Sequence, residues 1–450
     1  MRDKGTKKEL EIITGKAKNT FTRVLRKVQA NERLTHYSGL GTIWDYARSN
    51  GLVSLLNRTF PTIKQNALKF SNIQIIMSIV LGHVCGIHRL IRFENFTKDP
   101  LVSHLLALPD RIEDSTFKDR LQKFGKRGAI LLQESLFSLT RKWLGKMSLS
   151  KITIDCDSTV TTVYGKQQEG AAKGYNPNKK GSLSYHPLLC YCSEMKLLIN
   201  SWFRTGSAYT SNGICDFLNQ TLAMLPKQVK KIFFRADSGF FSGALFDLLE
   251  EGGHEYLVKV KLKNLSCLMK KQTWTQVNSK ESVCKFEYKC KDWKVSRKLK
   301  AVRILKGYRS YAILGEKYRI EEFDYFCYCS NLKGLCAIKL HALYGARAES
   351  ENWIEQVKNQ LHASQTVTDD FHVNDILWQL AVLGYNLSVI MRYEADHKIW
   401  KQEHKTFMMW FVNVPGKVVK SAREVIVKMS AHYWEASSWQ KFAAIVTSSA

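Results

Sequence analysis

The stretch from Lys151 to Ala236 constrains the fold most, because short apolar runs alternate there with polar and turn-forming residues. The runs read KITIDCDST, LSYHPLLCYC, MKLLINSWF and KKIFFRA, and a helix-like segment, ICDFLNQTLAML, precedes the last of them. Period-two alternation is typical of strands, whereas ICDFLNQTLAML has helical spacing. Strand, strand, strand, helix and strand in this order predict a mixed α/β sheet.

The rest of the chain divides around this sheet. Residues 1–150 carry apolar residues at helical spacing among Arg and Lys, and we expect a helical, DNA-binding region there. Residues 151–260 are expected to form the first part of the sheet domain, and residues 261–320 a basic, β-rich insertion. Residues 321–400 would complete the sheet domain, and residues 401–450 are expected to be helical.

The charge of the chain indicates its partner. Lys and Arg number 68 against 40 Asp and Glu, a net charge of +28, and such an excess usually compensates a polyanion, nucleic acid first. Residues 1–150 hold 26 basic and 12 acidic residues, and residues 259–306 hold 15 and 3. The most apolar stretch, residues 73–87, is shorter than the ~20 residues of a spanning helix. The N-terminus lacks an apolar signal core, so we expect a cytosolic protein without a membrane partner.

Acidic residues stand at the ends of two of the predicted strands. Asp155 and Asp157 are two residues apart and therefore share one face of the first strand, while Asp237 follows the run KKIFFRA directly. Carboxylate oxygens are the ligands that Mg²⁺ prefers, and two-metal phosphodiester chemistry needs carboxylates that converge from distant positions. These acids are therefore candidate metal ligands. The alternative for each is a turn or capping role, which the Ser-Gly after Asp237 favours.

A stripe of polar side chains is predicted on a long helix between about residues 339 and 363. Its members are Tyr344, Arg347, Glu351 and Lys358. At about 100° per residue they fall within one narrow sector, where a buried helix would carry apolar residues. Glu355, one turn past Glu351, lies near the same sector and stays open as the acid of this helix. The alternative for the whole set is a solvated, charged face.

The spacing Y-x2-R-x3-E-x6-K, with D-S-T at Asp157 and A-D-S-G-F at Asp237, resembles the DDE transposases of bacterial insertion sequences, in their large cut-and-paste group. The resemblance covers about residues 151–361. It implies an RNase H-like α/β fold with a mixed sheet, a β-rich insertion between the second Asp and the Glu, a helical N-terminal region and a helical C-terminal tail. It also implies that Asp157, Asp237 and Glu351 are catalytic and bind two Mg²⁺ ions, for which Mn²⁺ can substitute.

The resemblance implies a reaction and its partners. Water activated by metal would nick the transposon ends, and the freed 3′-hydroxyl would attack the opposite strand to give a hairpin and later attack target DNA. The partners would be the terminal inverted repeats, the target DNA and a second copy of the chain in a synaptic complex. The setting implied is the bacterial cytoplasm, on the nucleoid.

Further residues are expected to contact DNA. By the resemblance, Arg347 and Lys358 would bind phosphates near the scissile bond, the Arg in a bidentate manner. Tyr344 would contact the backbone through its hydroxyl. Lys179 and Lys180, in the loop GAAKGYNPNKKGS, are expected to contact DNA as well.

Hairpin formation needs a sharply bent strand, which is easier when a base leaves the stack and rests on an aromatic ring. Related enzymes place that ring on the strand before the signature helix. Tyr325 is the candidate here together with its neighbour Phe326, and Trp293 lies further back. The alternative for each of the three is packing in the core.

Two other functions stay open from the sequence. One is an RNase H-like nuclease or resolvase, which would share the carboxylates but would not need the polar stripe. The other is a DNA-binding protein derived from a transposase that no longer cuts. A cleavage assay with and without Mg²⁺ separates these readings.

Overall fold

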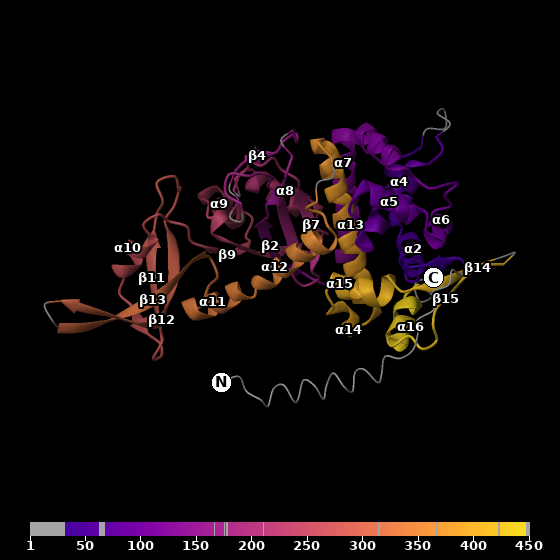
Figure 1. Ribbon diagram of the computed structural model, residues 1–450. Helices are drawn as coiled ribbons and strands as arrows, with labels where there is room; N and C mark the ends of the chain where they lie inside the picture. The colour runs from indigo at the N-terminus through magenta and orange to yellow at the C-terminus, as the bar shows by residue number, and fades with distance from the viewer. Residues whose placement is uncertain are drawn as a thin grey trace, which may run out of the picture.

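The computed structural model describes residues 32–62, 68–165, 167–174, 176, 179–209, 211–313, 316–365, 368–421 and 424–446. The first 31 residues of the expected N-terminal DNA-binding region lie outside the described residues. Figure 1 shows an elongated molecule with a β-rich arm at one end, helices at the other and a sheet between them.

The central sheet follows the predicted run of strands. Its members are β2 (Lys151–Ser158), β6 (Leu188–Cys192), β7 (Leu197–Trp202), β8 (Lys231–Ala236) and β9 (Glu255–Lys259). They lie in the order β9-β8-β2-β6-β7. Strands β8 and β9 run parallel to β2, whereas β6 is antiparallel to both of its neighbours. Helices α8 (Ile214–Met224) and α9 (Gly243–Glu251) precede β8 and β9 along the chain. The prediction of a mixed α/β fold is confirmed.

The segment between β9 and residue 336 adds four strands to the same sheet and forms the arm seen at one end of Figure 1. Its elements are α10 (Leu265–Lys270), β10 (Thr275–Gln276), β11 (Glu281–Tyr288), β12 (Arg297–Ile313) and β13 (Glu316–Ser330). The last residues of β13 pair antiparallel with β9, for example Ser330 with Leu257, which joins the arm to the central sheet. Residue 320, where the sequence suggested a domain boundary, lies inside β13.

Helices from both ends of the chain share one core. The N-terminal set comprises α2 (Leu40–Ser49), α3 (Leu52–Thr59), α4 (Asn72–Val84), α5 (Leu90–Thr97), α6 (Pro100–Leu105) and α7 (Asp114–Lys146). The buried helix α13 (Phe371–Ala395) packs against α4, α7 and β7. On its sheet side, the Trp378 indole donates to Ser201 Oγ (2.6 Å), and the Asn386 amide bonds to both backbone groups of Leu198. The N-terminal helices therefore pack into one core with the sheet, through α13, and do not form a separate domain on a linker.

The C-terminal tail differs from the expectation. The short helical segments α14 (His397–Trp400), α15 (His404–Phe407), η3 (Met408–Val412) and α16 (Ala436–Ala444) are present, but a hairpin of β14 (Gly416–Lys420) and β15 (Val425–Lys428) interrupts them. β14 also pairs with β1 (Leu34–Thr35). The prediction of a wholly helical tail is wrong for residues 416–428. The reason is the β-branched run at residues 418–419 and 425–427, which fits strands better than helices.

The long helix predicted for residues 339–363 is broken. The structure has α11 (Ala337–Gly345), α12 (Ala348–Glu355) and a π-helical turn, η2 (Gln356–Gln360), with a turn at Ala346–Arg347 between the first two. A small sheet of β3 (Thr161–Thr162), β5 (Leu183–Tyr185) and β4 (Ala172–Lys173) follows β2, and the 3₁₀ turn η1 (Ser238–Phe240) follows β8. Among the described residues, no helix is long and apolar enough to cross a membrane.

Candidate active site

The register of two parallel strands places the first two acids side by side. Strands β2 and β8 pair from Lys151 opposite Lys231 up to Cys156 opposite Ala236. Asp157 and Asp237 are the residues that follow this last pair, and neighbouring strands lie only ~4.8 Å apart. The Asp237 carboxylate also accepts the Gly239 amide (2.9 Å) and caps η1, so the capping role left open from the sequence applies in this structure.

Asp155, the rival of Asp157, has a different environment. Its carboxylate forms a buried bidentate ion pair with Arg235, at 2.7 Å to both Nε and Nη2, and accepts the Ser193 hydroxyl. Arg235 Nη1 donates to the Leu343 carbonyl (2.9 Å) near the end of α11. Asp155 therefore clamps β2, β8 and α11 together, and its oxygens are taken up by this role.

Helices α11 and α12 bring the third acid to the ends of these strands. Trp353 is buried with its ring 5.7 Å from that of Tyr191 in β6, which anchors α12 on the sheet. The Ser350 hydroxyl donates to the Arg347 carbonyl (2.8 Å) at the turn before α12. Tyr344, at the end of α11, packs against Tyr328 of β13 with ring centroids 5.1 Å apart.

Arg347 connects the sheet acids with the helix acid. Its buried guanidinium lies with Nη2 2.6 Å from Asp157 Oδ2 and Nη1 3.8 Å from Glu351 Oε1. Arg347 Nε has no hydrogen-bond partner in the part of the chain that the structure describes. The cation thus bridges one carboxylate of β2 and one of α12 while keeping a free donor.

The pKa shifts show that the three acids share one electrostatic environment. Burial raises the pKa of Asp157 to about 6; the Arg347 charge opposes this shift, and the charge of Asp237 adds to it. Burial also raises the pKa of the Tyr344 phenol; the Arg347 charge opposes this shift, and the charges of Asp237, Asp157 and Glu351 add to it. These influences agree with the geometry, in which Arg347 bridges Asp157 and Glu351 and the strand register sets Asp237 beside Asp157.

The residues fit a hard divalent cation by type. All three side chains offer carboxylate oxygens, which Mg²⁺ and Mn²⁺ prefer. Within the described residues, however, no three His, Cys, Asp or Glu side chains are grouped closely enough to hold a metal ion. Arg347 neutralises Asp157 and Glu351 instead, so metal binding would require its guanidinium to give way.

Glu355 and Lys358 differ in their relation to this cluster. The Glu355 carboxylate accepts the Gln360 amide (2.8 Å) and forms no ion pair with Arg347. Lys358 is half-buried and donates to the Val160 carbonyl (3.0 Å), three residues past Asp157, and burial lowers the pKa of this Lys. Lys358 thus lies beside the end of β2, whereas Glu355, the last residue of α12, is bonded to the π-helical turn η2 that follows.

The other predicted DNA contacts are dispersed. Lys179 and Lys180 are exposed, and the Lys179 ammonium lies 3.2 Å from the Tyr164 hydroxyl. Tyr325 packs against Trp274 of the arm, with ring centroids 5.7 Å apart, and the structure does not bring it to the acids. Phe326, on the opposite face of β13, packs against His341 of α11.

Trp293 is buried against Phe241 and Phe246 in the core. Core packing is therefore the observed environment of Trp293 and of Tyr325. Sequence reasoning missed Arg235, which stands two residues before Asp237 as Asp155 stands two residues before Asp157. Because both residues stand two positions before a strand-terminal Asp, they lie opposite each other when the two strands pair, and this spacing could have revealed the ion pair.

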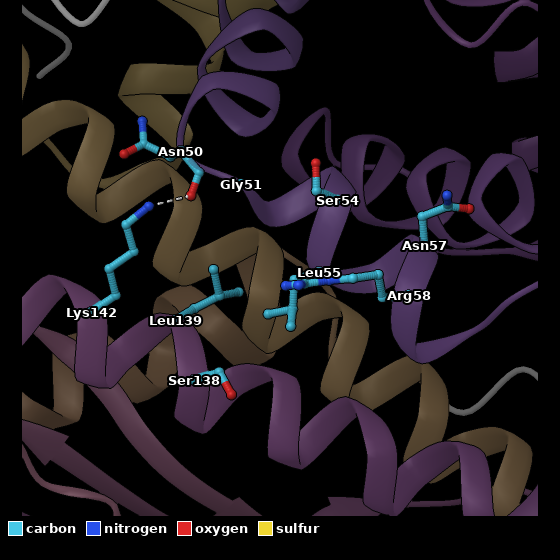
Figure 2. Close-up of a pocket in the computed structure, with 9 residues that line it drawn as sticks. All are labelled: Asn50, Gly51, Ser54, Leu55, Asn57, Arg58, Ser138, Leu139 and Lys142. Carbon is cyan, nitrogen blue, oxygen red and sulfur yellow. Dashed lines mark hydrogen bonds between the residues drawn. The ribbon is translucent and has the colours of Figure 1, made fainter.

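A cavity of about 530 Å³ between α3 and α7 is separate from this site. Figure 2 shows Lys142 and Arg58 at its opposite ends, with the Lys142 ammonium donating to the Asn50 carbonyl (2.8 Å). None of the predicted site residues lines it.

Known proteins provide the comparison. The family described as Transposase DDE domain group 1 matches residues 19–449. No curated protein sequence matches the chain. Among solved structures, a piggyBac transposase synaptic complex with hairpin DNA is 15% identical, covers 84% of this chain and 81% of its own, and has a TM-score of 0.45. A Mos1 transposase paired-end complex with the left transposon end is 11% identical over 38% of this chain and 58% of its own, at a TM-score of 0.18. Because the family match spans nearly the whole chain, the protein belongs to the transposases with a DDE domain of group 1.

Proposed function

We propose that this transposase moves a bacterial insertion sequence by cut-and-paste transposition, with Asp157, Asp237 and Glu351 as the ligands of two Mg²⁺ ions. The observation that carries the proposal is that Arg347 bridges Asp157 and Glu351, while the register of β2 and β8 sets Asp237 beside Asp157. When bound, Mg²⁺ or Mn²⁺ supplies an activated water and stabilises the attacking and leaving oxygens of an in-line displacement.

The chain's own residues would orient the DNA. Arg347 has a free Nε donor and a planar fork that suits a phosphate, so it can exchange a carboxylate for the DNA backbone. Lys358, beside the end of β2, would bind a neighbouring phosphate, and Tyr344 would donate its phenol to the backbone. Nicking, hairpin formation and strand transfer are successive displacements at phosphorus, which one site can perform.

The sheet supports an RNase H-like catalytic domain. Numbered along the chain, its central strands lie in the order third, second, first, fourth and fifth, with the second antiparallel to its neighbours. The first acid lies on the first strand and the second acid follows the fourth. The arm between the second Asp and the Glu supports the β-rich insertion that the signature group carries.

The partners we propose are the terminal inverted repeats and target DNA. Cutting and joining two ends requires that they be held together, so we propose a homodimer in the synaptic complex. The setting would be the bacterial cytoplasm, on the nucleoid.

The test compares two acids on one helix. Glu351→Gln should abolish strand cleavage, because an amide is a neutral and poorer donor to a hard cation, while gel-shift binding to the same DNA stays nearly intact. Glu355→Gln is the matched control and should still cut, since this side chain does not touch Arg347. Cleavage by Glu351→Gln but not by Glu355→Gln would move the third ligand by one turn. A native chain that binds DNA but never cuts it with Mg²⁺ would support the non-cutting alternative.

A further inference from the structure

A cavity of about 1,090 Å³ separates the N-terminal helices from the end of β2. Its walls come from the starts of α5 and α7, from the small sheet around β3 and from the segment after α12. We propose that this cavity is a DNA subsite that holds one unpaired nucleotide of the strand being cut. The proposal rests on the proposed function, because it needs a DNA strand at the three acids.

The location of the cavity favours a strand that leaves the acids. Val160 and Lys358 both line it, and they are joined by the 3.0 Å hydrogen bond from Lys358 Nζ to the Val160 carbonyl. Val160 follows Asp157 by three residues. A strand whose phosphate lies at Asp157 can therefore place its next nucleotide in this space.

Two buried polar atoms on the walls lack partners. Thr161 is only 1% exposed, and its hydroxyl has no hydrogen bond within the described residues. The side-chain carbonyl of Gln168 is likewise buried and unpaired. Buried polar groups are nearly always satisfied, so such atoms indicate a missing partner. The edge of a base offers both donors and acceptors to match a hydroxyl and an amide oxygen.

Two of the cations that line the cavity are not neutralised by an acid. Arg89 and Lys358 both line it and form no ion pair with any described residue. Lys118 is already paired with Asp369 at 4.0 Å, and Asp114 accepts a backbone amide. The unpaired positive charge of the cavity is therefore that of Arg89 and Lys358, to which a phosphate would bind.

Tyr164 supplies a stacking surface at the rim. Tyr164 is 81% exposed, and the Lys179 ammonium lies 4.5 Å from the centroid of its ring. An aromatic ring next to a cation is the usual pairing for single-stranded nucleic acid, because the ring stacks on a base while the cation binds the backbone. A cavity of about 1,090 Å³ lies at the upper end of small-ligand pockets, which measure about 300–1,000 Å³, and is large enough for a nucleotide.

The experiment measures binding without cleavage. Full-length protein in EDTA is titrated with a blunt duplex and with the same duplex carrying a short single-stranded overhang that contains 2-aminopurine. Fluorescence anisotropy reports affinity, and 2-aminopurine emission reports the surroundings of the unpaired base. The variants are Tyr164→Ala and the near-isosteric Thr161→Val. Tyr209→Ala, at a residue that is 69% exposed and outside the cavity, is the matched control.

We expect Tyr164→Ala to weaken binding of the overhang DNA by about tenfold, as loss of one base stack usually does. Thr161→Val should weaken it by roughly threefold or more, as loss of a hydrogen bond does, and should change the emission. Blunt-duplex affinity should be unchanged in both variants, and Tyr209→Ala should affect neither DNA.

Equal losses on the two DNAs, or no loss on either, would overturn the proposal. So would displacement of the overhang DNA by deoxyadenosine monophosphate alone, which would assign the cavity to a free nucleotide. The readout does not depend on the acids. If Glu351→Gln still cuts DNA while the overhang preference holds, the proposed ligand set fails and the subsite stands; the reverse result rejects the subsite alone.

Discussion

At the scale of single residues, the site is held together by an internal cation. Arg347 lies between Asp157 and Glu351, and a buried charge of this kind is tolerated only when it is paired. The pairing keeps the acids from repelling one another before DNA or metal arrives. It also means that the acids are not free ligands in this state.

The raised pKa of Asp157 predicts a pH dependence of cation binding. Burial raises the pKa of its carboxyl to about 6, the Arg347 charge opposes the shift and Asp237 adds to it. A carboxyl must lose its proton before it can bind a divalent cation, so affinity should decrease by roughly tenfold per pH unit below about 6. Calorimetric titration of the full chain with Mn²⁺ on either side of that pH measures the change. Asp157→Asn should bind weakly at both values, and a pH-independent affinity in the native chain would contradict the assignment.

The pair of Asp155 and Arg235 should contribute to stability rather than to ligation. Asp155→Asn would leave Arg235 buried without a counter-charge, which typically costs about 3–5 kcal/mol, and urea unfolding measures the loss. Asp110→Asn is the control, because Asp110 and its partner Lys69 are both more than half exposed and the variant should unfold as the native chain does. Loss of Mn²⁺ binding by Asp155→Asn without a change in unfolding would instead make Asp155 a ligand.

At the scale of elements, the sequence predicted the strands of the central sheet but not how they join. Alternation of apolar residues predicted β2, and a continuous apolar run predicted β8, which is buried on both faces; the terminal acids followed from that placement. The pairing of Asp155 with Arg235 needs the register between two strands far apart in sequence, and no local pattern contains it. The predicted site acids do share one environment, whereas Tyr325 belongs to the core of the arm.

The break between α11 and α12 was not predictable either, because it also depends on a contact with an element distant in sequence. Ala346 and Arg347 both have helical backbone angles, and neither is a helix breaker. The chain turns there while the Arg347 side chain pairs with Asp157 on another element. The C-terminal hairpin is the opposite case, because its β-branched residues were visible in the sequence and were outweighed by the amphipathic spacing around them.

The small sheet that carries Thr161 depends on one glycine. A Cβ at Gly206 would lie 1.9 Å from the Ser184 carbonyl oxygen and 2.5 Å from that of Ala172, both backbone atoms that cannot move aside. Gly206→Ala should therefore destabilise the protein by about 1–3 kcal/mol or more, measured by thermal or urea unfolding. Gly145→Ala in α7, where nothing lies within 4 Å, is the control and should be neutral or stabilising by up to about 1 kcal/mol. Equal unfolding of the two variants would mean that this sheet tolerates displacement.

At the scale of the whole molecule, positive charge lies on both sides of the acids. The basic arm forms one end of the molecule and the helices built on α13 form the other, with β2 and β8 between them (Figure 1). Carboxylates repel phosphates, so DNA reaches the acids only if cations on either side hold it. In this elongated arrangement the basic arm and the helices built on α13 would be the two DNA-binding surfaces that flank the acids.

The arm's share of DNA binding can be measured as a salt dependence. Lys285 and Lys298 are exposed, and the pairing of β11 with β12 places them on one face of the arm. Each phosphate contact releases condensed counterions, which adds about 0.9 to the slope of log affinity against log salt. Lys285→Ala with Lys298→Ala should flatten that slope by up to about two for duplex DNA.

The matched pair is Lys398→Ala with Lys401→Ala, two exposed lysines on α14 and just after it, away from the arm. This control should leave the slope nearly unchanged. If both double variants flatten the salt slope equally, the arm is only one part of a uniform basic surface, and a second DNA-binding surface must lie elsewhere on the molecule.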